Sequence, residues 1–182
     1  MKNIIFIPAV ISDKGEKKLR STPLIKKIFD YSIRSWKHFA NKHNCEVVVL
    51  DQPLMDSNIT SMAWQRYYVL DLLEQSNIKY NQVLIVDADT IVHPECPNFF
   101  ELTENKYTGV HDGVVYEWVM RSVECYSKFL FNNYNLNIWN YINGGFQIIN
   151  ESHKDHVNKF KEYYINNRDQ IYQVESTVKL GT

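Results

Sequence analysis

The stretch Val83-Leu84-Ile85-Val86-Asp87-Ala88-Asp89-Thr90 indicates both the fold and the place of the functional site. Its four consecutive apolar residues predict a strand buried on both faces, as strands of parallel sheets are. Two carboxylates, Asp87 and Asp89, follow at the carboxyl end of this strand. Open α/β sheets bind their ligands beyond the carboxyl ends of the strands. This segment therefore predicts a central strand and the edge of the sheet that carries function.

Strand-like and helix-like patterns alternate on both sides of this segment. Further short strands are expected over residues 3–10, 46–50, 107–111 and 146–149. Helical spacing of apolar residues covers residues 22–44, 60–75 and 153–164, and an aromatic-rich helix is expected within residues 112–140. Strands that alternate with helices predict an α/β fold with a mainly parallel sheet flanked by helices. No linker-like segment divides residues 1–182, so we expect a single domain.

Composition excludes several classes of function. The formal net charge of the 182 residues is -1, so no overall basic excess favours nucleic acid as a partner. The longest apolar run, residues 4–11, is far shorter than the ~20 residues of a membrane helix, and we expect no transmembrane segment. The three cysteines form no zinc-binding spacing, and their odd number fits a reducing compartment, so a cytoplasmic location is expected.

The two carboxylates after the buried strand favour a divalent cation. In extended backbone, Asp87 and Asp89 would point the same way, with Cα atoms roughly 6 to 7 Å apart. Two such charges repel each other, and a shared cation turns this repulsion into attraction. Oxygen ligands favour Mg²⁺ or Mn²⁺ over zinc. The acidic pair alone is also compatible with a solvated turn.

Three segments in order resemble the GT-A glycosyltransferases, closest to the glycogenin-like and bacterial galactosyltransferase-like enzymes. They are Trp64-Gln65-Arg66, Val86-Asp87-Ala88-Asp89-Thr90-Ile91-Val92 and Tyr141-Ile142-Asn143-Gly144-Gly145-Phe146-Gln147-Ile148-Ile149-Asn150. The resemblance implies a single Rossmann-like GT-A domain and a hexosyltransferase-type activity. It implies Mn²⁺ or Mg²⁺ at Asp87 and Asp89, a nucleoside diphosphate sugar donor such as a UDP-sugar, and a glycan or other hydroxyl acceptor.

The same resemblance assigns roles to further residues at this edge of the sheet. The residues implied for the donor nucleotide are Ile7, Pro8, Ala9, Asp51, Arg66, Asp87, Ala88 and Asp89. Those implied for the sugar or acceptor are Asn143, Gly144, Gly145 and Trp139. Physical arguments stand beside these assignments. Arg66 can bind phosphate with two hydrogen bonds, and glycines allow positive φ and close approach of a ligand to the backbone. Asn143 offers an amide donor and acceptor, and Trp118 or Trp139 can stack on a sugar ring.

The catalytic group is left open. The chain ends at Leu180-Gly181-Thr182, before the Asp-Gln segment and the C-terminal metal-binding histidine that the resemblance implies. Either the domain is truncated at its C-terminus, or other residues take these roles. Asn143 and Asp112 are the candidates for catalysis, with His111 and Glu117 as further possibilities.

Two other functions fit parts of the sequence. An apolar strand followed by Asp-Ala-Asp-Thr-Ile also matches the motif of haloacid-dehalogenase-like phosphatases, with Asp87 as nucleophile and Asp89 as acid and base. However, 86 residues precede the motif here, and no Gly-Asp-x-x-x-Asp follows it. The second alternative is a nucleotide-sugar-binding module without turnover.

Overall fold

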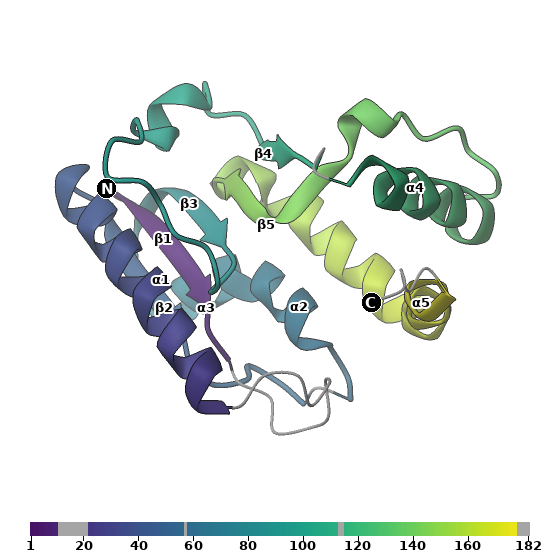
Figure 1. Ribbon diagram of the computed structural model, residues 1–182, viewed down its shortest axis with the longest axis horizontal. Coiled ribbons are helices and arrows are strands. Elements are labelled where there is room, and N and C mark those ends of the chain that lie inside the picture. The colour runs from purple at the N-terminus through teal and green to yellow at the C-terminus, as the bar shows by residue number, and fades with distance from the viewer. Residues whose placement is uncertain (11–21, 57, 113–114, 178–182) are drawn as a thin grey trace.

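The computed structural model describes residues 1–10, 22–56, 58–112 and 115–177. Five strands form one open sheet in the order β2-β1-β3-β5-β4 (Figure 1). Their bounds are Lys2–Pro8 for β1, Glu46–Leu50 for β2, Tyr80–Val86 for β3, Thr108–His111 for β4 and Ile142–Ile149 for β5. Helices flank this sheet, which confirms the predicted α/β class.

Strand direction brings several strand ends to one edge of the sheet. β1 pairs in parallel with β2 and β3, whereas β5 is antiparallel to both β3 and β4. The sheet is therefore mixed, and β5 alone runs against the other four strands. Val86 at the end of β3 pairs with Phe146, and His111 at the end of β4 pairs with Ile142. The start of β5 consequently lies between the carboxyl ends of β3 and β4.

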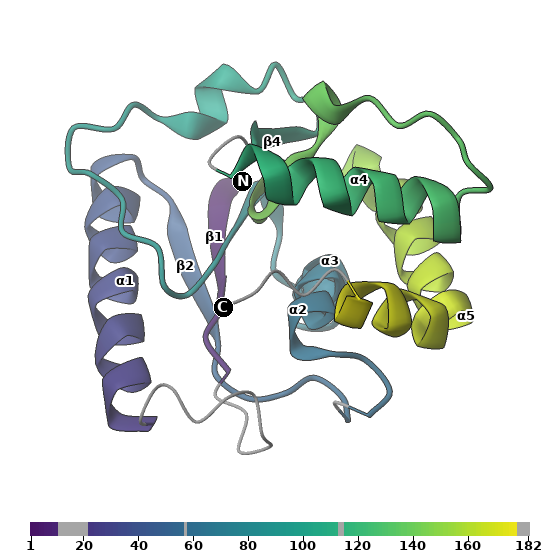
Figure 2. The ribbon, with the colours of Figure 1, turned by 45° about the vertical axis from the view of Figure 1, so that its right-hand side comes forward.

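Helix α1 (Thr22–Lys42) packs on one face of the sheet (Figure 2). Trp36 and Phe39 are almost completely buried there, and their rings meet edge to face. This layer buries apolar side chains from three strands and the loop after β3, among them Ile5, Ile7, Leu84, Val86, Ala88 and Ile148. Burial of this apolar area is the main force that holds α1 on the sheet.

The other face is covered by α3 (Val69–Gln75) and by α5 (Lys154–Thr177). Its core contains Ile4, Phe6, Leu70, Leu73, Val83, Ile85 and Val157. Two short turns of helix, α2 (Met62–Gln65) and the 3-10 helix η1 (Arg66–Tyr68), precede α3. The expected single helix over residues 60–75 is thus divided by a 3-10 turn.

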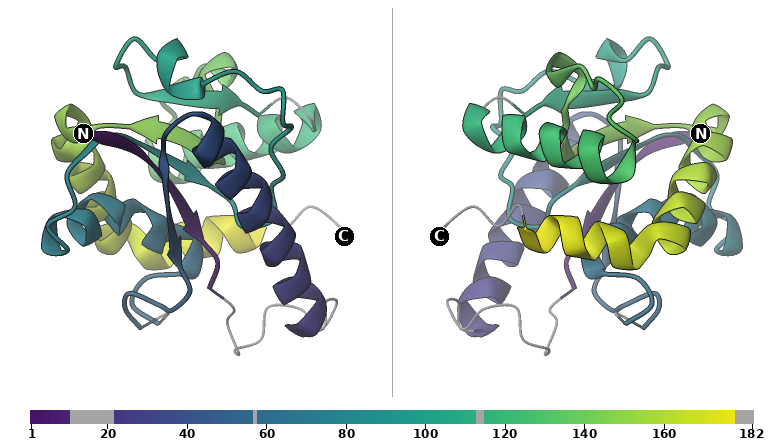
Figure 3. Two further views of the ribbon diagram at one scale, coloured as in Figure 1. Left: turned by 90° about the vertical axis from the view of Figure 1, so that its left-hand side faces the viewer. Right: turned by 90° about the vertical axis from the view of Figure 1, so that its right-hand side faces the viewer.

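Helix α4 (Tyr116–Leu130) lies beside α5 (Figure 3). Tyr163 donates a hydrogen bond to the carbonyl oxygen of Leu130, at 3.1 Å. Helix α5 is kinked at Asn167, where φ is -119° and ψ is 17°. The kink turns the last part of α5 toward α4 and α2 (Figure 2). Three short 3-10 helices complete the described chain: η2 (Phe99–Leu102), η3 (Ile138–Asn140) and η4 (Glu151–His153).

Two elements extend beyond the residues expected for them. The strand expected over residues 146–149 begins at Ile142, so residues 143–145 lie within β5. The helix expected over residues 153–164 continues as α5 to Thr177. Within the described ranges, no helix combines the length and apolar character needed to cross a membrane.

Candidate functional site

A cavity of about 670 Å³ lies at the carboxyl edge of the sheet. The end of β3 and the start of β5 form its floor. Its walls come from α2 with η1, from α4 and from the last turns of α5. Seven of the candidate residues line it: Arg66, Asp87, Asp112, Trp118, Asn143, Gly144 and Gly145. The topology thus gathers residues from distant segments of the chain around one space.

A tight turn positions Asp87 immediately after β3. The amide of Thr90 donates to the carbonyl oxygen of Asp87 at 3.2 Å, and the Thr90 hydroxyl donates to the same oxygen at 2.7 Å. The indole of Trp36 on α1 donates to the Thr90 hydroxyl at 3.0 Å. Residues 87–90 therefore form a turn anchored to α1. The expectation of extended backbone at Asp87 and Asp89 was wrong.

Arg66 supplies the positive charge in the described lining of the cavity. Its Nη1 lies 2.8 Å from Asp87 Oδ1 and donates to the carbonyl oxygen of Gly144 at 2.6 Å. Its Nε donates to the carbonyl oxygen of Ala63 on α2, at 2.7 Å. Only 14% of the Arg66 side chain is exposed. The guanidinium is therefore held over the strand ends by three fixed partners.

Gly145 is required because the Asp87 carboxylate occupies the space of a side chain. An ideal Cβ on Gly145 would lie 2.1 Å from Asp87 Oδ2 and 3.0 Å from Asn143 Oδ1. The same construction on Gly144 meets nothing closer than 3.8 Å. Neither glycine has φ in the left-handed region, so the positive φ that glycine allows is not used here. The group that approaches the Gly145 backbone closely is the carboxylate of Asp87.

Asn143 links the start of β5 to Asp112. Its Oδ1 accepts a hydrogen bond from the amide of Gly145 at 2.7 Å, and its Nδ2 donates weakly to Asp112 Oδ2 at 3.4 Å. The amide of Asp112 donates to the carbonyl oxygen of Tyr141 at 3.1 Å and so extends the β4–β5 ladder by one step. The Asn143 amide nitrogen and the Asp112 carboxylate thus face the cavity with hydrogen-bonding capacity to spare.

Gln147 on β5 forms hydrogen bonds with residues of the cavity floor, and it was not among the site residues predicted from the sequence. It is 2% exposed, and its Nε2 donates to the hydroxyl of Tyr67 at 3.1 Å and to the carbonyl oxygen of Gly144 at 3.2 Å. Its Oε1 accepts from the hydroxyl of Tyr107. Burial raises the pKa of Tyr107, so this phenol stays a donor at every physiological pH. A polar residue within the apolar run of residues 146–149 was the signal for this role.

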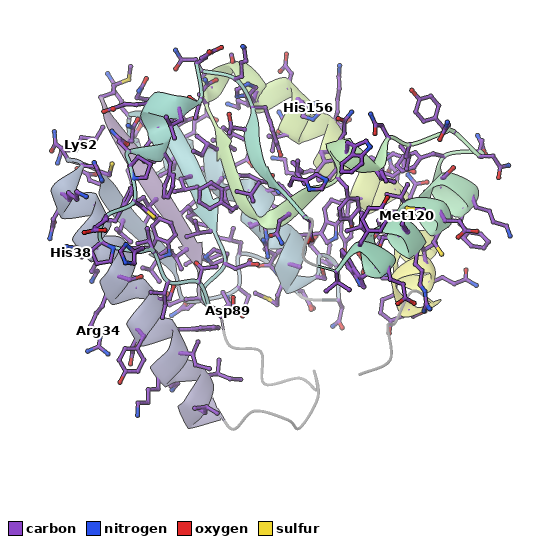
Figure 4. All side chains as sticks on the ribbon, turned by 45° about the horizontal axis from the view of Figure 1, so that its top comes forward. Lys2, Arg34, His38, Asp89, Met120 and His156 are labelled. Atoms are coloured by element: carbon purple, nitrogen blue, oxygen red, sulfur yellow. The ribbon has the colours of Figure 1, made fainter. Side chains whose placement is uncertain are left out.

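Other predicted donor residues lie at the same edge of the sheet but not in the lining of this cavity. Asp89 is exposed at the edge where β3 ends (Figure 4). Asp51 is exposed directly after β2. The side chains of Ile7, Ala9 and Ala88 are buried in the core beneath α1, and Pro8 is half-buried. The amide of Ala9 donates to the carbonyl oxygen of Leu50 at 2.8 Å.

The two candidate tryptophans lie in different places. Trp118 on α4 lines the cavity, and its ring meets Tyr141 edge to face at 5.8 Å. Trp139 is 69% exposed and stacks on His111 in a separate hollow beside β4. Glu117, the remaining candidate, forms an ion pair with Arg121 on the surface of α4. Of these two candidates, Trp118 is the one that lines the cavity containing Asp87.

The acidic pair supplies part of a site for a hard divalent cation. Asp87 presents carboxylate oxygens to the cavity, and Asp89 follows it in the same turn. Among the residues that the structure describes, no group of three or more histidine, cysteine or acidic side chains is gathered at one point. Mg²⁺ is commonly bound by one or two carboxylates together with substrate phosphates and water, so two aspartates fit such an ion.

Comparisons with known proteins add no further constraint. No protein-family model, no curated protein and no solved structure matches the chain.

Proposed function

We propose that the chain is a metal-dependent glycosyltransferase with the GT-A fold. It would transfer a sugar from a nucleoside diphosphate sugar, such as a UDP-sugar, to a hydroxyl group of a glycan or another acceptor. The observation that carries the proposal is the meeting of Arg66, Asp87 and Gly145 at the edge of one cavity. These residues come from the three segments that carry the resemblance, and the segments are distant in the sequence.

The chain's own residues suit the parts of such a reaction. Asp87 and Asp89 would hold Mn²⁺ or Mg²⁺, which stabilises negative charge on a leaving diphosphate when it is bound. Arg66 is placed to exchange its contact with Asp87 for a contact with phosphate, because a guanidinium binds either anion with similar geometry. Asn143 and Asp112 can bind or orient sugar hydroxyls, since each retains hydrogen-bonding capacity toward the cavity.

The phosphatase alternative is less well supported. In that family the motif stands on the first strand, whereas here 86 residues precede Asp87 and the strand before it is the third of the chain. No Gly-Asp-x-x-x-Asp, the later acidic motif of that family, follows in the sequence.

Release of UDP from UDP-sugars tests the proposal. Release that needs Mn²⁺ and increases with an acceptor supports transfer. Binding of UDP without any release, across a panel of acceptors, would instead support a non-catalytic binding module. Hydrolysis of p-nitrophenyl phosphate that is lost in Asp87→Asn, without UDP binding, would support the phosphatase.

A further inference from the structure

A second hollow, of about 520 Å³, lies beside β4, which is an edge strand of the sheet (Figure 1). It is lined by the segment between η2 and β4, by β4 itself, and by η3 with the first residue of β5. An ideal Cβ on Gly109 would lie 3.0 Å from Ile142 Cδ1, so a side chain at position 109 would crowd Ile142. Glycine at this position therefore lets Ile142 pack directly on the backbone of β4.

An exposed aromatic ring stands at this hollow. Trp139 is 69% exposed, and its indole lies nearly parallel to the ring of His111, with ring centroids 5.9 Å apart. The side chain of Asn137 caps η3, because its Oδ1 accepts a hydrogen bond from the amide of Trp139 at 3.0 Å. The capped turn and the stacked imidazole hold the indole in place, so a ligand meets an aromatic surface that is already positioned.

Polar groups with balanced charge surround this ring. Asn140 contributes an exposed carboxamide. The hydroxyl of Thr108 donates to the carbonyl oxygen of Lys106 at 3.0 Å and can still accept hydrogen bonds. Lys106 in turn forms an ion pair with Glu104 at 2.5 Å, so these two opposite charges offset each other. The hollow therefore combines an open ring face, hydrogen-bonding groups and no marked excess of charge.

This hollow adjoins the larger cavity at the carboxyl edge of the sheet. Ile142 lines both spaces. Residues next to each other in the sequence also divide between the two: His111 lines the hollow and Asp112 lines the cavity, while Asn140 lines the hollow and Tyr141 lines the cavity. One extended ligand can therefore contact both spaces across the end of β4 and the start of β5.

The chemistry of the hollow suits a neutral sugar. The apolar face of a sugar ring packs on an aromatic side chain, and its hydroxyl groups exchange hydrogen bonds with amides and hydroxyls. Resting on the function proposed above, we propose that the hollow is a second carbohydrate-binding site, which holds a sugar unit of the acceptor away from the reacting one. The acceptor is then a neutral glycan chain. Trp139 provides the stacking surface, and Asn140 and Thr108 bind hydroxyl groups.

The test compares ligands of different length. Maltotetraose, cellotetraose and mannotetraose are titrated beside the methyl glycosides of glucose and mannose, and binding is followed by ligand-observed NMR, so that no tryptophan serves as the reporter. We expect at least one tetrasaccharide to bind roughly fivefold or more tightly than its methyl glycoside, because it gains the stacking contact. Trp139→Ala should remove this gain without weakening the methyl glycoside, and Trp139→Tyr should keep most of it. Tyr134→Ala is the matched control, because Tyr134 is 68% exposed and does not line the hollow.

Several results would overturn this inference. They are equal affinities for tetrasaccharides and methyl glycosides, no binding of any tetrasaccharide at millimolar concentration, or the same effect of Trp139→Ala and Tyr134→Ala. Mn²⁺-dependent UDP binding, measured on the same preparation, tests the proposed function separately. If UDP binds and chain length has no effect, the second site fails and the glycosyltransferase proposal stands. If the gain through Trp139 is seen and UDP does not bind, the glycosyltransferase proposal fails and the hollow remains a carbohydrate site.

Discussion

The carboxylate of Asp87 occupies the space that any side chain at position 145 would need. An ideal Cβ on Gly145 would lie 2.1 Å from Asp87 Oδ2, while Asp87 Oδ1 is held 2.8 Å from Arg66. The amide of Asp87 also donates to the carbonyl oxygen of Gly145 at 3.0 Å, as part of the β3–β5 pairing. The position of this carboxylate is therefore set by the backbone of β5 and by one arginine.

Replacement of Gly145 by alanine tests this relationship. The added methyl group must displace the Asp87 carboxylate, so Gly145→Ala should weaken Mn²⁺-dependent UDP binding by roughly tenfold or more, which is about 1.4 kcal/mol. Gly144→Ala is the control, because its methyl group would meet only ordinary contacts at 3.8 Å or more. Calorimetry measures both variants. Equal affinities in the two would show that Asp87 moves aside without consequence.

A double-mutant cycle tests the ion pair of Arg66 and Asp87. Without metal, Arg66→Met, Asp87→Asn and the double variant should give a coupling free energy of about 1 kcal/mol in urea denaturation, since the pair is partly buried. The control cycle uses Lys106 and Glu104, whose side chains are both 74% exposed. That cycle should give less than about 0.5 kcal/mol. Similar coupling in the two cycles would contradict a special role for Arg66.

Gln147 should stabilise the floor of the cavity. Gln147→Leu leaves the hydroxyls of Tyr67 and Tyr107 without this partner, so we expect a loss of about 1–3 kcal/mol in the free energy of unfolding. Gln52→Leu, at an exposed position, should change it by less than about 0.5 kcal/mol. Urea denaturation distinguishes the two. A loss at position 147 no larger than at position 52 would show that water replaces these bonds readily.

His153 should make stability depend on pH. Its Nδ1 accepts a hydrogen bond from the amide of Asn150 at 3.0 Å, which only a neutral imidazole can do. Burial and the neighbouring His156 lower the pKa of His153 below its usual 6.5. The unfolded chain therefore binds a proton more readily, so this stabilisation is present above pH 6.5 and is lost as the pH falls through the lowered pKa.

The variant His153→Gln should flatten that part of the profile. Thermal melts from pH 7.5 to pH 5 should show a smaller decrease in Tm for the variant than for the parent chain. The variant His156→Gln adds a second test, because removing this neighbouring imidazole removes its lowering effect and should raise the pKa of His153. Parallel Tm profiles for all three proteins would contradict the assignment.

Much of the fold followed from sequence periodicity. The apolar run before Asp87 predicted the central strand, and the alternation of strands and helices predicted the α/β class. The start of β5 was missed, because its first three residues are exposed and two glycines have little preference for strands. The antiparallel direction of β5 depends on tertiary packing, and no local pattern encodes it.

The candidate site was predicted in part. Asp87, Arg66 and Asn143 were named from the sequence, and they line one cavity. Glu175 was missed because the kink at Asn167 brings it there, and helical periodicity does not reveal a kink. Trp139 was also named from the sequence; it stacks on His111 in a separate hollow, and helical or strand periodicity does not reveal which hollow a side chain enters.

The central claim is that Asp87 binds a metal that recruits a nucleoside diphosphate. Calorimetric titration of UDP into the chain, with and without Mn²⁺, tests it most directly, and Asp87→Asn is the matched variant. The account predicts that Mn²⁺ strengthens UDP binding at least tenfold and that Asp87→Asn abolishes this gain, while circular dichroism shows an intact fold. The same UDP affinity with and without Mn²⁺, or a gain from Mn²⁺ that survives in Asp87→Asn, would contradict it.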